Sequence, residues 1–344
     1  TWGTNAITLD SNGLNYQGQD DSYDVEYGTD GQDVHIVYSG ATNGWIPILD
    51  KTVADVPVKG NQNGIFGYGN AGGSYVSMTN LVSNAGVVAT DVTGVGTARD
   101  YITATEYGGD KGIFGYGESD SGYVSMTNLV SNTGVVATDV TGVGTARWYL
   151  VACGYGGDKG IFGYGYTGSY VSLTNLVSNV GVVATDVTGV GTARARLAAC
   201  EYGDDKAIFG FGWTGSNVSM SNLVSNAGVV ATDVTGVGTA RNFLAACSYG
   251  GDKGIFGYGH TGSIVSMTNL VSNSGVVASD VTGVGTARYD LAACEYGQGK
   301  GIFGYGYVSA DISLTNLVSD SGVVATDTTG VGTARRTPGA CSYN

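Results

Sequence analysis

The chain has 344 residues, 60 of them glycine, and a formal net charge of −14. It has no basic run, so we expect no nucleic-acid partner, because phosphate contacts need clustered Lys and Arg. No apolar stretch approaches the roughly 20 residues of a membrane span, so we expect none. Frequent Val, Thr and Tyr between Gly-rich turns predict an all-β protein.

Residues 1–58 do not repeat. Four stretches have the composition of short strands, at residues 6–10, 22–27, 33–38 and 44–49. We expect a small β segment that attaches the chain to a partner, with a turn at residues 29–31. The pair Asp20 and Asp21 lacks the ligand spacing of a calcium loop, and we expect no metal or other cofactor. Because the chain starts at Thr1 and not at Met, we expect processing or a longer product.

From residue 59 to residue 344 the chain consists of six nearly unchanged units, each containing Gly-Ile-Phe-Gly-Tyr-Gly or a close variant. The copies start at Gly64, Gly112, Gly160, Ala207, Gly254 and Gly301, at offsets of 48, 48, 47, 47 and 47 residues. A fixed period of this length is typical of solenoids, propellers and arrays.

Each unit can be divided into four strands, which in the third unit are residues 150–155, 161–164, 170–177 and 180–186. The tight turns between them predict an antiparallel sheet. Alternation predicts that Phe162 and Tyr164 share one face of their strand, with Gly163 on the other face. Stacked sheets would then set the aromatic side chains of one against the glycines of the next.

The two ends of the repeated region predict how it is completed. The repeats begin with the second strand of a unit and end with the first. Residues 338–343 match the first strand, whereas residues 55–59 do not. We therefore predict that the C-terminal strand completes the sheet that starts near Gly64, which gives a six-bladed β-propeller.

The five cysteines occupy equivalent positions, each 47 residues after the last: Cys153, Cys200, Cys247, Cys294 and Cys341. Equivalent positions in separate sheets are usually too far apart for a disulfide. We expect buried small residues, with a disulfide framework or metal site as the alternative.

Positions that differ between copies are candidates for binding, since the shared fold does not fix them. Two such positions follow a repeated Arg: Asp100 and Tyr101, Trp148 and Tyr149, Ala195 and Arg196, Asn242 and Phe243, Tyr289 and Asp290, Arg336 and Thr337. A third follows Gly-Tyr-Gly: Asn70, Glu118, Tyr166, Trp213, His260 and Tyr307. Because the first two strands form a hairpin, we expect all of these at one rim. Aromatic rings beside polar groups suit recognition of a sugar or a protein surface. Neutral drift on permissive loops is the alternative.

The repeated arginines are Arg99, Arg147, Arg194, Arg241, Arg288 and Arg335, and a repeated aspartate follows the last strand of each unit: Asp91, Asp139, Asp186, Asp233, Asp280 and Asp327. We expect each Arg to pair with such an Asp or with a carbonyl group. A pore-lining anion site is the alternative.

Catalysis has little support. The only histidines, His35 and His260, lie in unrelated contexts, so neither a Ser-His-Asp set nor a His-based metal site is visible. We expect no enzyme; a hydrolase would need an acid at the rim, such as Asp290.

The sequence resembles two groups of known proteins. Arg147, followed by strands starting at Leu150, Ile161, Tyr170 and Val180, resembles the unit order of kelch-type β-propellers, with Gly-Tyr-Gly where those have Gly-Gly. Residues 33–48 resemble a module of phage tail-fibre and other virion proteins, and the Gly-rich repeats resemble marine phage fibre-like repeats.

These resemblances imply a virion or extracellular location. We therefore predict a virion fibre or adhesin component whose rim binds a host cell-surface glycan or protein, and whose residues 1–58 contact other virion or fibre subunits. The alternative is a structural decoration or filament subunit that assembles through the same surfaces.

Overall fold

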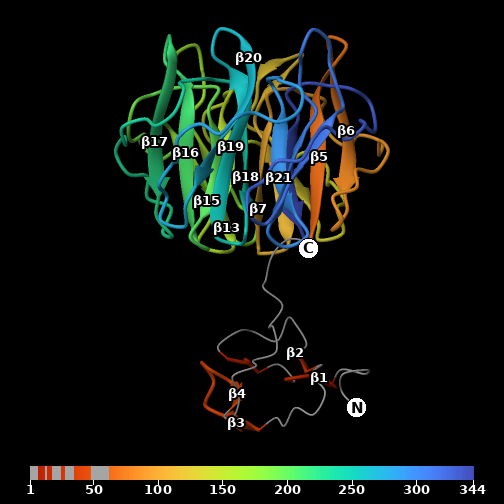
Figure 1. Cartoon of the computed structure of the whole chain (residues 1–344), viewed down its shortest axis with the longest axis vertical. Helices are drawn as coiled ribbons and strands as arrows, with labels where there is room; N and C mark the ends of the chain where they lie inside the picture. The colour runs from red at the N-terminus through yellow and green to blue at the C-terminus, as the bar shows by residue number, and fades with distance from the viewer. Residues whose placement is uncertain (1–6, 12–13, 18–24, 28–34, 48–61) are drawn as a thin grey trace. The chain divides into compact units, whose positions relative to one another are not determined.

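The computed structural model describes residues 7–11, 14–17, 25–27, 35–47 and 62–344. All regular structure in these residues is β, arranged in many small antiparallel sheets (Figure 1). None of these residues forms a helix that is long and apolar enough to cross a membrane. The chain divides into two compact units, Thr1–Lys59 and Gly60–Asn344, which are described separately.

The first unit contains two short hairpins. β1 (Ile7–Leu9) pairs with β2 (Val25–Tyr27), and β3 (Ile36–Tyr38) pairs with β4 (Trp45–Pro47). Each of the four predicted stretches contains one of these strands. The predicted turn at residues 29–31, the Asp20 and Asp21 pair, and residues 55–59 lie outside the described residues.

The second unit contains six three-stranded sheets in which every neighbouring pair is antiparallel. In chain order of their middle strands, they are β24-β5-β6 (Gly339–Tyr343, Asn63–Ala71, Ser74–Val82), β7-β8-β11 (Thr103–Tyr107, Lys111–Gly115, Thr127–Val130), β12-β13-β14 (Val151–Tyr155, Lys159–Gly163, Thr174–Val177), β15-β16-β17 (Ala198–Tyr202, Lys206–Trp213, Asn217–Val224), β18-β19-β20 (Ala245–Tyr249, Lys253–His260, Ile264–Val271) and β21-β22-β23 (Ala292–Tyr296, Lys300–Gly304, Thr315–Val318). A small ribbon, β9 (Glu118–Ser119) with β10 (Gly122–Tyr123), adjoins the second of them.

The predicted fourth strand is reduced to single bridges. In the third unit these join Val177 to Val183 and Thr174 to Val187. Between the bridges, the side-chain amide of Asn175 donates hydrogen bonds to the Ala184 carbonyl and the Asp186 carboxylate. A side chain therefore occupies positions that backbone groups would hold in a continuous ladder, which the strand composition alone did not reveal.

The two ends of the repeated region meet. β24 pairs with β5, which places Cys341 opposite Ile65 and Ala340 opposite Phe66. Figure 1 shows β5, in orange, among the blue strands of the C-terminal end. Backbone hydrogen bonds join each sheet to the next, donated by the NH groups of Gly108, Gly156, Gly203, Gly250, Gly297 and Asn344 to the carbonyls of Asp158, Asp205, Asp252, Gly299, Gln62 and Asp110.

Neighbouring sheets pack by setting a phenylalanine against a glycine, as predicted. A Cβ built on Gly115 would lie 2.7 Å from Cζ of Phe162, and the same contact recurs between the other units. The expected common face of Phe162 and Tyr164 is wrong, however. Phe162 contacts Tyr116 of the preceding sheet, at 5.1 Å between ring centroids, whereas Tyr164 contacts the following sheet. The cause is the left-handed φ of +61° at Tyr164, which breaks the alternation of the strand.

All five cysteines are buried and free. The contacts place most of them beside a glycine of the following sheet: Cys200 beside Gly254, and Cys294 beside Gly64. In the one unit with Ala207 at that position, Cys153 packs in the same core cluster as the alanine. Burial raises the pKa of the Cys200 thiol, so its reactive thiolate form is disfavoured.

We predict that Gly257→Ala lowers the free energy of unfolding by about 1–3 kcal/mol, because its Cβ would lie 2.7 Å from Cζ of the wholly buried Phe303. Chemical denaturation measures the loss. Gly254→Ala is the matched control. Its Cβ would clash with Sγ of Cys200, the end of a side chain that can rotate, and the fourth unit already accommodates Ala207 in the same core cluster as Cys153. Its loss should be less than half as large, and equal losses would contradict the steric argument.

Candidate functional site

The structure brings the predicted variable positions together at one edge of each sheet. The first residue after each repeated Arg is called the second row, and the residue after Gly-Tyr-Gly is called the third row; the inner and outer rows on either side of them are defined below. In every unit the second-row residue forms a β-bridge with the third-row residue. The bridges are Arg336 with Asn70, Asp100 with Glu118, Trp148 with Tyr166, Ala195 with Trp213, Asn242 with His260, and Tyr289 with Tyr307. Several of these side chains are buried, including Asp100 and Asn242, and so do not lie on open loops.

An outer row at the same edge was not predicted. Tyr75, Tyr123, Tyr170, Asn217, Ile264 and Asp311 lie opposite the third row, at the start of the third strand of each unit. They also differ between copies, so the comparison that found the other rows could have found them. All four rows together are called the variable face.

The inner row consists of the second residue after each Arg: Tyr101, Tyr149, Arg196, Phe243, Asp290 and Thr337. These six residues surround one cavity of about 130 Å³. Hydrogen bonds between consecutive units hold the row, such as that from Arg196 N to Tyr149 O at 3.0 Å and from Thr337 N to Asp290 O at 2.7 Å.

The backbone of the inner row is strained. All six residues have a left-handed φ between +46° and +58°, although none of them is glycine. For an ordinary residue this conformation costs on the order of 1–2 kcal/mol, and such costs concentrate at functional sites. The fold therefore keeps large side chains at this cavity at some expense in stability.

Aromatic rings form a continuous chain across the variable face. Trp148 stacks on Tyr123 at 5.2 Å and lies 4.0 Å from Tyr149, measured between ring centroids. The chain continues from Tyr149 to Phe243 and from Phe243 to Tyr289. Trp213 lies opposite Ala195 instead of another ring. The buried Nε1 of Trp148 and Oδ1 of Asn242 lack hydrogen-bond partners within the described part of the chain, which is unusual for buried polar atoms.

Charged groups are set among these rings. The guanidinium of Arg196 lies against the rings of Tyr149 and Phe243, at 4.6 and 4.5 Å from their centroids. Arg336 pairs with Asp311 at 3.3 Å. Burial raises the pKa of Asp290 to about 7, against the opposing effect of Arg336 and Arg196. Burial, with the nearby charge of Glu118, also raises the pKa of Asp100 to about 7.

The opposite ends of the inner strands enclose a smaller cavity of about 50 Å³, lined in part by Glu106, Glu201 and Glu295. Burial, followed by the charge of Glu106, raises the pKa of Glu295 to about 8. Glu295 accepts a hydrogen bond from the backbone of its own turn, Gly299 N, at 2.6 Å. Within the described residues no group of three or more His, Cys, Asp or Glu side chains could hold a metal ion.

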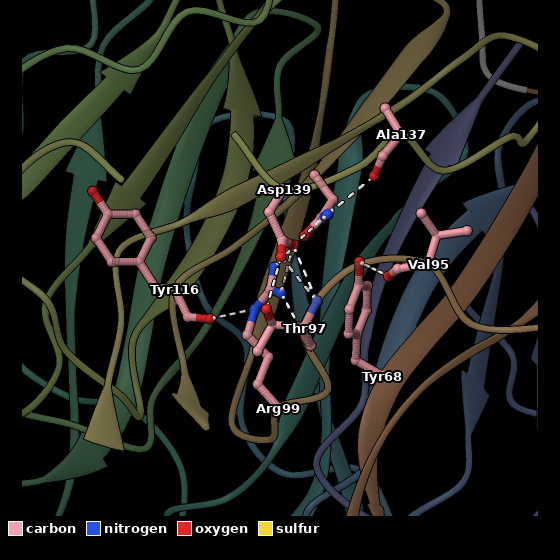
Figure 2. A network of polar contacts seen from close by, with 8 residues as sticks. Tyr68, Val95, Thr97, Arg99, Tyr116, Ala137 and Asp139 are labelled. Carbon is pink, nitrogen blue, oxygen red and sulfur yellow. Dashed lines mark hydrogen bonds and ion pairs between the residues drawn. The ribbon is translucent and has the colours of Figure 1, made fainter. Parts of the chain in front are cut away.

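The repeated arginines lie wholly buried between neighbouring sheets. Arg99 lies over Tyr68 of the preceding sheet, and its Nε donates to the Tyr116 carbonyl at 3.0 Å (Figure 2). Its Nη1 lies 3.7 Å from Asp139, which also accepts hydrogen bonds from Thr97 and Asn128. The arginines thus contact carbonyls and carboxylates, and none of them lines the two cavities described above.

We predict that Asp280→Asn destabilises the protein by about 1–3 kcal/mol at pH 7, because it weakens hydrogen bonds to Thr239 and leaves Arg241 without its carboxylate. Hydrogen bonds from Thr239 and Asn269 outweigh burial and lower the pKa of Asp280 in the folded state. Its contribution is therefore complete above about pH 4 and is lost as the pH falls through the folded pKa.

Denaturation curves from pH 7 to pH 2 test this prediction, since the difference between wild type and variant should shrink below about pH 4. Asp320→Asn is the control, because the other copies have asparagine at that position. A stability difference between wild type and variant that does not change with pH would contradict the contribution assigned to the ionised Asp280 carboxylate.

A scan against protein-family models and a search of curated protein sequences both find no match to this chain.

Proposed function

We propose that residues 59–344 form a six-bladed β-propeller whose variable face binds a carbohydrate without catalysing a reaction. Three features support the closed ring. β24 pairs with β5, Phe66 packs against Gly304 of the last sheet, and backbone hydrogen bonds join each sheet to the next, including the last to the first. Radial repetition of this kind leaves no end sheet with an uncovered face.

The binding proposal depends mainly on one observation: the rows that differ between copies adjoin one another at one edge, while the shared framework beneath them is nearly identical. The resulting surface combines aromatic rings, such as Trp148, with polar and charged side chains, such as Arg336 and Asp311. Rings supply large apolar contact area at low entropic cost, and the polar atoms can select hydroxyl groups. Sugars present both kinds of surface.

The biological setting is a proposal from resemblance. The repeats and the module at residues 33–48 support a virion fibre or adhesin, with residues 1–58 contacting the particle or a neighbouring subunit. Several weak contacts around a ring would raise avidity through effective concentration.

One observation favours the alternative of a structural subunit. β3 exposes Ile36, Val37 and Tyr38, which are apolar or aromatic side chains that a neighbouring subunit could cover. In that case the purified chain should assemble in a way that sugars do not affect and that deletion of residues 1–55 disrupts.

We predict that Trp148→Ala weakens glycan binding by about tenfold or more, because stacking on an aromatic anchor is worth about 1–3 kcal/mol. A glycan array followed by calorimetry on the best hit measures the change. Val276→Ala is the control. It truncates an exposed side chain outside the variable face and should bind the glycan as the wild type does. Absence of binding to any glycan, or turnover of the bound glycan, would contradict the proposal.

We also predict that deletion of residues 338–344 lowers the melting temperature strongly, because β5 loses its partner strand. Deletion of residues 1–58 is the control and should leave the unfolding transition of the second unit in place. Scanning calorimetry compares the two chains. A transition unchanged by the C-terminal deletion would exclude the closed ring.

A further inference from the structure

The cavity enclosed by the inner row has an apolar wall. Directly after each inner-row residue comes an aliphatic or proline side chain: Ile102, Leu150, Leu197, Leu244, Leu291 and Pro338. Its volume of about 130 Å³ is close to the roughly 150 Å³ cavity that accommodates a benzene molecule. The space suits a single six-membered ring.

Asp290 is a nearly buried carboxylate at this cavity. The residue is 8% exposed and lines the cavity. Among the described residues its carboxylate accepts no hydrogen bond and makes no ion pair within 4.0 Å, although Arg196 and Arg336 are close enough to affect its ionisation. Burying a carboxyl group without a partner is costly, and an unpartnered one facing a cavity points to a ligand that donates a hydrogen bond.

Arg196 supplies the complementary donor. The rings of Tyr149 and Phe243 both lie against its guanidinium, at 4.6 and 4.5 Å from Cζ, and 5.6 Å separates the two ring centroids, so both rings pack toward one side of it and help to fix its position. The side chain is partly exposed and lines the same cavity as Asp290. The cavity thus offers an acceptor and a fixed donor, with the ring of Phe243 as part of its wall.

We propose that this cavity binds one neutral sugar ring, with hydroxyl groups between the Asp290 carboxylate and the Arg196 guanidinium. This inference rests on the proposed carbohydrate-binding function and names the unit that enters the centre of the variable face. A hydroxyl group both donates and accepts, so it satisfies both side chains. The ring of Phe243 can cover the C–H face of the sugar.

Charged ligands fit the site less well. A carboxylate on the ligand would meet Asp290, with Asp100 and Asp311 near enough to contribute to the local negative potential. An ammonium group would meet Arg196 and Arg336. Since the site contains both signs of charge, it disfavours either sign on a small ligand.

The test uses the full chain and a panel of free monosaccharides: neutral hexoses, the corresponding uronic acids and the corresponding amino sugars. Ligand-observed NMR and calorimetry measure binding. We expect at least one neutral hexose to bind and its charged counterparts to bind at least about tenfold more weakly. Asp290→Asn and Arg196→Gln should each weaken binding by about tenfold or more, because charge-assisted hydrogen bonds are lost. Asp320→Asn is the charge-matched control and should have no effect.

Stability gives a second readout. Because Asp290 is buried without a partner, Asp290→Asn should leave the melting temperature unchanged or raise it, and raise it more at pH 8 than at pH 5. The sign follows from the folded pKa of about 7, since the carboxyl is charged above that pH and neutral below it. The charged groups that act on it are Arg196, Arg336, Asp100 and Asp311. The phenol groups of Tyr101, Tyr149 and Tyr289 also interact with it. A structural role for Asp290 would lower the melting temperature instead.

The outcomes separate the two proposals. Binding of larger glycans that requires Trp148 but is unaffected by Asp290→Asn would overturn the cavity inference and leave the proposed function standing. Preference for an acidic or amino sugar would also overturn the cavity inference. Absence of binding to every monosaccharide and glycan would overturn both.

Discussion

The buried arginine of each unit is the interaction on which the variable face depends. The guanidinium is removed from water, and at Arg99 it is satisfied by a ring of the preceding sheet and by carbonyl, amide and carboxylate oxygens of its own unit. In two units the satisfaction is incomplete, because Nη2 of Arg288 and Nε and Nη2 of Arg335 have no hydrogen-bond partner among the residues that the structure describes. The backbone carbonyl of the arginine also accepts a hydrogen bond from a glycine of the preceding sheet, as from Gly69 to Arg99 at 3.0 Å. The two residues that follow are variable, so a fixed anchor determines where they lie.

This arrangement separates the residues that hold the fold from those that can recognise a ligand. Phenylalanine, glycine, cysteine and arginine make the same contacts at nearly every joint between sheets. The inner row adds backbone hydrogen bonds between consecutive units, as from Phe243 N to Arg196 O. Side chains at these positions can therefore differ without loss of the joint. The cost is conformational strain, because the inner-row residue of every unit has a left-handed backbone.

Much of the fold could be predicted because it depends on local patterns repeated six times: the period, the hairpins, the packing of Phe on Gly and the burial of cysteine. The opposite orientations of Phe162 and Tyr164 could not, because the left-handed residue is a tyrosine with glycines on both sides. Nor could the loss of the fourth strand, because it depends on the side chain of Asn175. The variable rows were found by comparing copies, but the environment of Asp290 arises only where six distant segments converge.

The contacts between neighbouring sheets are nearly the same in every unit, and this has a consequence for evolution. Because each sheet meets the next through nearly identical contacts, those contacts do not themselves fix the number of units. Unequal recombination within the gene could add or remove a copy and leave every remaining joint intact. In the proposed closed ring, what would change is the circumference at the inner row, and with it the width of the cavity there. If that cavity binds the proposed ligand, copy number would adjust the size of the accepted molecule independently of any point substitution.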